Sequence, residues 1–122
     1  MPKTILLVDD SSTMRVAQRI AISKLTNYNV VCASSGHEAL EKAFSETPDL
    51  ILMDVVMPGM DGLEVCRELR RNPRTMKLPI VLVTFRNGEA SVQEGYQSGC
   101  TDYLMKPVKD GELLTVLNKY LG

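Results

Sequence analysis

The sequence contains no tryptophan, a single histidine and only three cysteines among its 122 residues. Cys32, Cys66 and Cys100 lie far apart and form no Cys-x-x-Cys pair, so neither a disulfide framework nor a cysteine-based zinc site is indicated. We expect all three to be small buried side chains in a reducing compartment. The one histidine, His37, follows Gly36 near an expected helix start; it is a poor candidate for a catalytic base, and we expect it at the surface.

Long hydrophobic runs and a strong excess of one charge are also missing. No apolar run approaches the ~20 residues of a membrane span, and the run at 5–8 is too short for a signal peptide. The formal net charge is -1, so the chain does not have the excess of basic residues that is typical of nucleic-acid-binding proteins. We therefore predict a cytoplasmic protein without a nucleic-acid or membrane partner. The densest basic stretch is interpreted as a solvated helix end and comprises Arg67, Arg70, Arg71, Arg74 and Lys77.

Hydrophobic residues make up 44% of the chain and alternate between two spacings. Short runs rich in Ile, Leu and Val are separated by longer segments with helical periodicity. Expected helix N-caps are Ser11 or Ser12, Ser35 with Glu38, and Asp61 with Glu64, and Gly99 suits a helix end. Five strand–helix repeats imply an α/β fold, with a parallel sheet covered on both faces, in one domain over 1–122. The expected strands are 4–8, 29–33, 50–53, 80–83 and 102–105.

Carboxylates stand directly after two of these strands. Asp9 and Asp10 follow the first, and Asp54 follows the third. Because the carboxyl ends of parallel strands line the ligand crevice of such sheets, the three acids are expected to converge. Their mutual repulsion indicates that a cation or a proton intervenes. Asp54 is the candidate nucleophile of this site.

A hydroxyl and an ammonium group follow the last two strands. Thr84 comes after the fourth and Lys106 after the fifth. Hard oxygen ligands suit Mg²⁺, and a carboxylate can accept a phosphoryl group as an acyl phosphate. Thr84 and Lys106 are placed to hold the phosphoryl oxygens. No Gly-x-x-x-x-Gly-Lys or Gly-x-Gly-x-x-Gly loop is present, so nucleotide binding has little support.

Five motifs in this order resemble the response-regulator receiver domains of two-component signalling. The motifs are Val8–Ser11, Asp49–Asp54, Met57–Gly62, Val83-Thr84 and Lys106-Pro107, and the resemblance spans the whole chain. The resemblance implies a (βα)5 doubly wound sheet of the flavodoxin-like strand order 2-1-3-4-5, with helices on both faces. It also implies a cis bond between Lys106 and Pro107.

The resemblance assigns a role to each residue of the site. Asp54 is the implied phosphoacceptor. Mg²⁺ would be held by Asp10 directly, by Asp9 mostly through water, by Asp54 and by the backbone carbonyl of Val56. Lys106 would contact the phosphoryl group, Thr84 would move toward it after transfer, and Tyr103 would be the aromatic switch that rotates inward.

The resemblance also implies partners. A sensor histidine kinase or a phosphotransfer protein would donate the phosphoryl group. The face built from the fourth helix, the fifth strand and the fifth helix would then change shape. That face would engage a downstream protein target, a fused output domain or a second copy of the chain. The output is recognition, so the chain is expected to be a switch and not an enzyme.

Three residues depart from the family pattern. Phe85 stands where receivers usually carry a small residue, and it either restricts access to the site or forms part of a partner surface. Val56 and Arg86 occupy positions that tune the lifetime of the phosphoryl group. Val56 cannot orient an attacking water by hydrogen bonding, so we hypothesise a long-lived phosphorylated state.

Two other functions remain open from the sequence. An interaction module that works without phosphorylation is compatible with Phe85. An aspartyl phosphohydrolase would carry a second acid two residues after its nucleophile, where this chain has Val56. That substitution argues against turnover.

Overall fold

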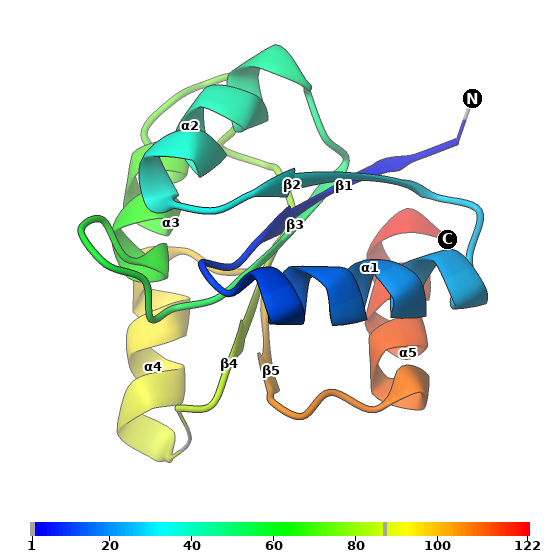
Figure 1. Ribbon diagram of the computed structural model, residues 1–122. Helices are drawn as coiled ribbons and strands as arrows, with labels where there is room; N and C mark the ends of the chain where they lie inside the picture. The colour runs from blue at the N-terminus through cyan, green and yellow to red at the C-terminus, as the bar shows by residue number, and fades with distance from the viewer. Residues whose placement is uncertain (1, 87) are drawn as a thin grey trace.

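The computed structural model describes residues 2–86 and 88–122, in which five strands alternate with five helices (Figure 1). All strand pairs are parallel, and the strand order is β2-β1-β3-β4-β5. The predicted fold class and strand order are therefore confirmed, and the fourth strand reaches one residue further than expected. The elements are β1 Thr4–Val8, α1 Ser12–Leu25, β2 Asn29–Ala33, α2 Gly36–Ser45, β3 Leu50–Met53, α3 Gly62–Arg70, β4 Ile80–Thr84, α4 Glu89–Ser98, β5 Asp102–Met105 and α5 Asp110–Leu121.

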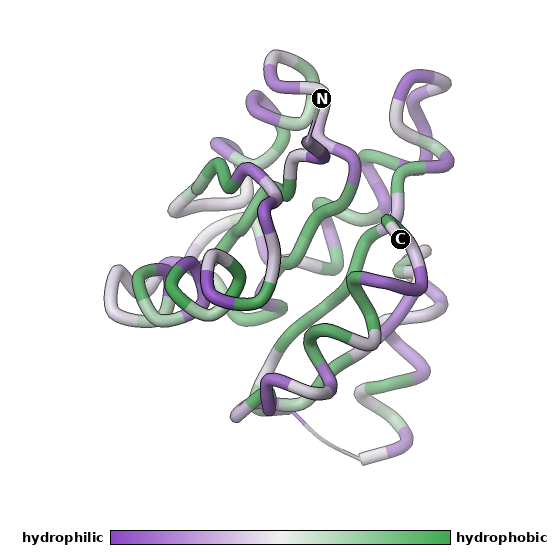
Figure 2. Tube along the Cα trace, turned by 90° about the vertical axis from the view of Figure 1, so that its right-hand side faces the viewer, coloured by the Kyte–Doolittle hydropathy of each residue, from purple (hydrophilic) through white to green (hydrophobic). Residues whose placement is uncertain are grey.

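Helices cover both faces of the sheet, which explains why its inner strands are apolar throughout. Helices α1 and α5 lie on one face, and α2, α3 and α4 lie on the other (Figure 1). Every residue of β3 and β4 is buried, as expected for parallel strands enclosed by two layers. Figure 2 shows the hydrophobic colour concentrated along the strands and the hydrophilic colour at the outer turns. Two apolar clusters result, one on each side of the sheet.

The helix termini follow the local signals in the sequence. The predicted caps Ser11, Ser35 and Asp61 accept hydrogen bonds from the backbone N–H groups of Met14, Glu38 and Glu64 at 3.3, 3.1 and 2.9 Å. The second half of a capping box at Ser35 does not form, because the Glu38 carboxylate accepts from the Ser34 backbone N–H at 2.6 Å. Gly99 ends α4 with φ of 107°, a left-handed conformation that favours glycine.

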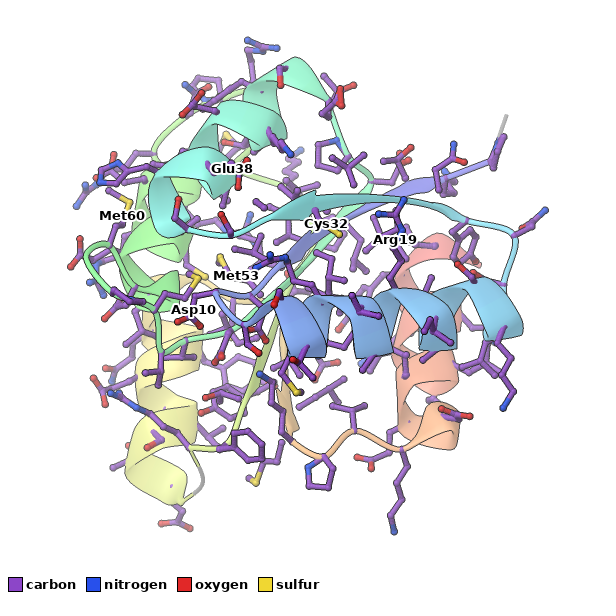
Figure 3. The ribbon with its side chains drawn as sticks, in the orientation of Figure 1. Asp10, Arg19, Cys32, Glu38, Met53 and Met60 are labelled. Carbon is purple, nitrogen blue, oxygen red and sulfur yellow. The ribbon has the colours of Figure 1, made fainter. Side chains whose placement is uncertain are left out.

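The cysteines are all free, and His37 is exposed, as the sequence predicts. Cys66 and Cys100 are buried, and burial raises the pKa of their thiols to about 11 and about 12. Cys32 is only half-buried, since it lies on the edge strand β2 near Arg19 of α1 (Figure 3). None of the helices in the described residues combines the length and apolar character that crossing a membrane requires.

The interpretation of the basic stretch as solvated is wrong for one member, Arg70. Its guanidinium group donates hydrogen bonds to the carbonyl oxygens of Gly99, Thr75 and Met76 at 2.8, 3.1 and 3.2 Å. A fourth bond, of 3.2 Å, reaches the hydroxyl of Thr101. Arg70 therefore joins the end of α3 to the segments that lead into β4 and β5. The other four basic residues of the stretch are exposed, as predicted.

Candidate functional site

The carboxyl ends of four adjacent strands bring the predicted site residues together. Asp9 follows β1, Asp54 follows β3, Thr84 ends β4 and Lys106 follows β5. The Lys106 ammonium nitrogen lies 2.7 Å from an oxygen of Asp9 and 3.1 Å from an oxygen of Asp54. Asp10 lies at the same end of the sheet, where β1 leads into α1 (Figure 3).

This cluster is both buried and unbalanced in charge. The side chains of Lys106 and Asp9 are 2% exposed, and that of Asp54 is 12% exposed. Burial opposes the charge of Lys106, but hydrogen bonds to Asp9 and Asp54 and their negative charges outweigh it and raise the pKa of Lys106. One carboxylate oxygen from each of Asp9, Asp10 and Asp54 lies within 4.8 Å of the other two. Within this cluster one ammonium group accompanies three carboxylates, so the four groups together carry excess negative charge.

The donor set fits Mg²⁺. Carboxylate oxygens are the ligands this ion prefers, and it usually takes one or two of them together with water. Asp10 is exposed while Asp9 and Asp54 are held from the other side by Lys106, so the open side of the cluster faces solvent. An ion bound there would relieve the repulsion that Lys106 leaves.

Backbone contacts hold Asp54 in place. Its N–H donates to the Val8 carbonyl oxygen at 2.9 Å, which continues the pairing of β3 with β1. One of its carboxylate oxygens accepts from the Val56 N–H at 3.2 Å. The start of α3 then passes so close that a Cβ at Gly62 would collide with the Asp54 carbonyl oxygen. Glycine is required there by this close approach.

Thr84 and Tyr103 are linked through the backbone of Arg86. The Thr84 hydroxyl accepts a hydrogen bond from the Arg86 N–H at 3.3 Å, and the Tyr103 hydroxyl donates to the Arg86 carbonyl oxygen at 3.0 Å. Thr84 is fully buried. Tyr103 is half-buried, and desolvation raises the pKa of its hydroxyl. The structure therefore connects Tyr103 to Thr84 through one residue, Arg86.

An open depression of about 440 Å³ leads to Asp54. The Phe85 ring lies over one side of the cluster, with its centroid 5.4 Å from the Lys106 ammonium nitrogen. The sequence places Phe85 next to Thr84 but does not reveal this contact, because it joins residues from two different strand ends. The depression is lined by Asp10, Asp54, Val56, Thr84, Phe85 and Arg86.

Comparison with known families identifies the class of protein. Residues 5–118 match the family model of the response regulator receiver domain. The chain belongs to this family, whose members act in two-component systems, and the resemblance seen in the sequence is confirmed. The peptide bond between Lys106 and Pro107 is cis, as the resemblance implies.

Individual relatives agree with this assignment. The transcriptional regulatory protein AfsQ1 of Streptomyces coelicolor is 38% identical over 120 residues, which are 95% of this chain and 52% of that protein. The response regulator PleD of Caulobacter vibrioides is 43% identical over 112 residues, which are 90% of this chain and 24% of PleD. The chain thus spans about half the length of the first and about a quarter of the second.

Solved structures share the fold over nearly the whole chain. The chemotaxis protein CheY4 of Vibrio cholerae superposes with a TM-score of 0.91 at 33% identity, covering 99% of this chain and 100% of CheY4. The receiver domain of the sensor histidine kinase PA1611 from Pseudomonas aeruginosa superposes with a TM-score of 0.90 at 30% identity, covering 98% of both chains. That structure has a magnesium ion coordinated in its active-site cleft.

Proposed function

We propose that this receiver domain is a phosphorylation-controlled switch with Asp54 as its phosphoacceptor. The observation that carries the proposal is the Lys106 ammonium group bridging Asp9 and Asp54, with the three carboxylates clustered around it. Such a site has excess negative charge and a fixed cation, which suits binding of Mg²⁺ and of a phosphoryl group. Membership of the receiver family supports the same assignment.

The donor is proposed to be a phosphohistidine of a sensor kinase or a phosphotransfer protein. A carboxylate oxygen of Asp54 attacks phosphorus, so an O–P bond forms as the N–P bond of phosphohistidine breaks. The electron pair stays on the imidazole nitrogen, which takes up a proton. Lys106 lies 3.1 Å from the accepting carboxylate and offsets the charge of the incoming group.

Asp10, Asp9, Asp54 and the Val56 carbonyl would hold Mg²⁺, either directly or through water. When bound, the ion supplies charge neutralisation for the phosphoryl oxygens. Val56, two residues after Asp54, has no group able to act as an acid or base, which favours a lasting phosphorylated state over turnover. The domain is therefore proposed to be a switch and not a phosphohydrolase.

Phosphorylation is proposed to act through the Thr84–Arg86–Tyr103 connection. A phosphoryl group on Asp54 would offer hydrogen-bond acceptors to the hydroxyl of Thr84, a residue at the same depression. Movement of Thr84 would release the Arg86 N–H and alter the loop that holds Tyr103. The resulting population shift changes the face of α4, β5 and α5, where a downstream protein, a fused output domain or a second copy would bind.

A reducing location, the cytoplasm, is also proposed, and the state of the cysteines supports it. All three cysteines are free, and two are buried, which suits the cytoplasm, where thiols stay reduced. Neither nucleic acid nor membrane is proposed as a direct partner of this domain. AfsQ1 is named a transcriptional regulatory protein, and any such output by this chain would require a further domain.

Intact mass spectrometry tests the proposal. The protein is incubated with Mg²⁺ and either acetyl phosphate or a phosphorylated histidine phosphotransfer domain. We expect a single phosphoryl adduct that is lost in Asp54→Asn and when EDTA removes the metal. Steady release of inorganic phosphate over many turnovers would indicate a phosphohydrolase instead. If neither donor produces an adduct, the chain is an interaction module that works without phosphorylation.

A further inference from the structure

Asp10 is the exposed member of the acidic cluster, at the end of β1 (Figure 3). The Asp9 carboxylate is held on both sides: one oxygen lies 3.0 Å from the Ser11 backbone nitrogen, and the other lies 2.7 Å from the Lys106 ammonium nitrogen. Among the hydrogen bonds of the described residues, none reaches the Asp10 carboxylate. The position of that carboxylate therefore depends on the backbone that carries it.

Arg15 of α1 holds the peptide group that precedes Asp10. Its guanidinium Nη1 donates a hydrogen bond of 2.7 Å to the backbone carbonyl oxygen of Asp9. That oxygen belongs to the planar peptide unit that joins Asp9 to Asp10, so the bond fixes the orientation of the unit from which Asp10 starts. The preceding peptide unit is fixed as well, because the Asp9 N–H donates to the Ala33 carbonyl oxygen at 3.2 Å.

Helix stability does not explain a cation at the position of Arg15. It is the fourth residue of α1, and the positive end of the helix dipole disfavours positive charge in the first turn. The side chain points back toward the helix start and reaches a residue six positions earlier. None of the ion pairs among the described residues includes Arg15. Arg15 therefore orients the acidic segment without occupying a carboxylate oxygen that a metal ion could use.

We infer that Arg15 is a positioning residue for the proposed Mg²⁺ site: it holds the Asp9–Asp10 peptide unit so that the Asp10 carboxylate faces the ion. The inference rests on the Mg²⁺-dependent phosphoacceptor function proposed for this domain. Residues that orient metal ligands from behind typically contribute about 10- to 100-fold to metal affinity. Removal of the Arg15 hydrogen bond should therefore weaken Mg²⁺ binding by about tenfold or more.

The charge of Arg15 by itself predicts the opposite result. If Arg15 acted through its positive charge alone, neutralising it would strengthen the binding of a divalent cation to the nearby carboxylates. A purely structural role, in which Arg15 only joins α1 to β1, would lower the stability of the protein and leave the Mg²⁺ affinity of the folded protein unchanged. The direction of the change in affinity thus separates the three roles.

The experiment measures the Mg²⁺ dissociation constant of wild type, Arg15→Met and Arg19→Met from the backbone amide NMR signals of the acidic cluster. Arg19→Met is the matched control, because it removes the same charge from the same helix. Arg19 is exposed, lies further along α1 than the turn at Asp10, and donates to the Cys32 sulfur at 3.9 Å (Figure 3). Urea unfolding in EDTA measures the stability of each protein separately.

We expect Arg15→Met to bind Mg²⁺ about tenfold more weakly than Arg19→Met, and the signal of the Asp9 carbonyl carbon to shift in Arg15→Met before any metal is added. Arg19→Met should bind Mg²⁺ as well as the wild type or slightly better, as loss of a distant positive charge requires. Equal affinities of the two variants would overturn the inference, and so would tighter binding by Arg15→Met.

A measurement on the wild type decides the question if Arg15→Met does not fold. Coupling between two interactions is reciprocal, so a hydrogen bond that strengthens Mg²⁺ binding must itself be strengthened by Mg²⁺. Saturating Mg²⁺ should then slow the rotation of the Arg15 guanidinium group, which its side-chain NMR signals report, and leave that of Arg19 unchanged. Rotation of Arg15 that does not respond to Mg²⁺ would contradict the inference.

Failure of the inference is distinct from failure of the proposed function. If wild type, Arg15→Met and Arg19→Met bind Mg²⁺ equally and all form the Asp54 adduct, the phosphoacceptor role stands and the positioning role is wrong. If the wild type shows neither a Mg²⁺-dependent change at the cluster nor an adduct with any donor, the proposed function is wrong, and the positioning role is wrong with it.

Discussion

Two side-chain cations, Lys106 and Arg70, lie at opposite ends of the strands of the same sheet. Their hydrogen-bond partners differ in charge. At the carboxyl edge, Lys106 binds two carboxylates, and a third lies close by. At the amino edge, the hydrogen bonds of Arg70 recorded among the described residues all go to neutral oxygens. The Lys106 cluster therefore contains more carboxylates than cations. The Arg70 guanidinium, in contrast, donates to carbonyl and hydroxyl oxygens that carry no net charge.

The difference separates a site from a structural clamp. The excess negative charge of the three carboxylates attracts a cation, so the Lys106 end of the sheet is sensitive to ligands. The Arg70 guanidinium group instead uses its N–H donors on four neutral acceptors within the protein, so its hydrogen bonds do not depend on a ligand. Burial lowers the pKa of Arg70, although the nearby cysteines counteract this, and an arginine side chain remains charged regardless. Each of the following experiments tests this contrast.

Replacing Lys106 by methionine should have the largest effect on stability, and Mg²⁺ should reverse much of it. Removing the cation leaves Asp9 and Asp54 as buried carboxylates without their partner, at a cost of about 3–5 kcal/mol in unfolding free energy. Urea unfolding in EDTA and in excess Mg²⁺ measures both values.

The control for Lys106→Met is Lys119→Met, whose side chain is 63% exposed and lies 3.8 Å from Asp102. It should change the unfolding free energy little under either condition. If Lys106→Met loses the same amount of stability with and without Mg²⁺, the Lys106 cluster is not sensitive to the ion, and the contrast with Arg70 is wrong.

Replacing Arg70 by alanine should cost about 3 kcal/mol, because several charged hydrogen bonds are lost together. The loss should be the same in EDTA and in Mg²⁺, since no site residue contacts Arg70. Arg71→Ala is the matched control: its side chain is 68% exposed and pairs with Glu68 of the preceding helix. A loss below about 1 kcal/mol for Arg70→Ala, as expected of a surface cation, would contradict its role as a clamp.

Replacing Gly95 by alanine affects the contact between α4 and Tyr103 of β5. A Cβ at Gly95 would lie 2.9 Å from the Tyr103 ring, so the ring must move and its hydroxyl should leave the Arg86 carbonyl. Overpacking and the lost hydrogen bond should exceed the helix-propensity gain of alanine, for a net loss of about 1–2 kcal/mol. NMR signals of the Tyr103 ring and urea unfolding report the two effects.

Gly111→Ala is the control for Gly95→Ala, because a Cβ there meets nothing within 4 Å. It should stabilise the protein by about 0.5–1 kcal/mol through helix propensity alone. If Gly95→Ala behaves in the same way and the Tyr103 signals stay unchanged, the ring is not held by the space at Gly95.

Replacing Asp10 by asparagine should have the smallest effect and the opposite sign. It removes one of the three clustered carboxylates, which should stabilise the metal-free protein by about 1 kcal/mol. Excess Mg²⁺ should cancel the gain, because wild type then binds the ion better. Glu94→Gln makes the same change in net charge on α4 and should leave the stability within about 0.5 kcal/mol. Destabilisation by Asp10→Asn in EDTA would argue against charge repulsion in the cluster.

Local signals in the sequence predicted much of the fold. Four strands have the predicted bounds, because short apolar runs and their flanking turns are encoded by neighbouring residues. The caps Ser11, Ser35 and Asp61 were predicted for the same reason. The meeting of Asp9, Asp54, Thr84 and Lys106 was also predicted, since strand ends in a parallel sheet share one edge.

Contacts between segments that are distant in the sequence could not be predicted from these local signals. Arg70 was grouped with its exposed neighbours, because nothing around it in the sequence reveals that Gly99 and Thr101 lie against it. The packing of Tyr103 on Gly95 was missed for a similar reason: a glycine inside a helix has meaning only once its neighbour across the gap is known. The strand order came from a family resemblance and not from the spacing of the strands.

The sequence by itself determined which residues form strands, where the helices begin and which polar side chains stand at the strand ends. These properties depend on hydrophobic period and capping chemistry, which act over a few neighbouring residues. Only the tertiary structure decided that Lys106 bridges two carboxylates, that Phe85 lies over it and that Arg70 closes the opposite edge. Those choices arise when elements far apart in the chain are brought together, and charge and burial then depend on every neighbour at once.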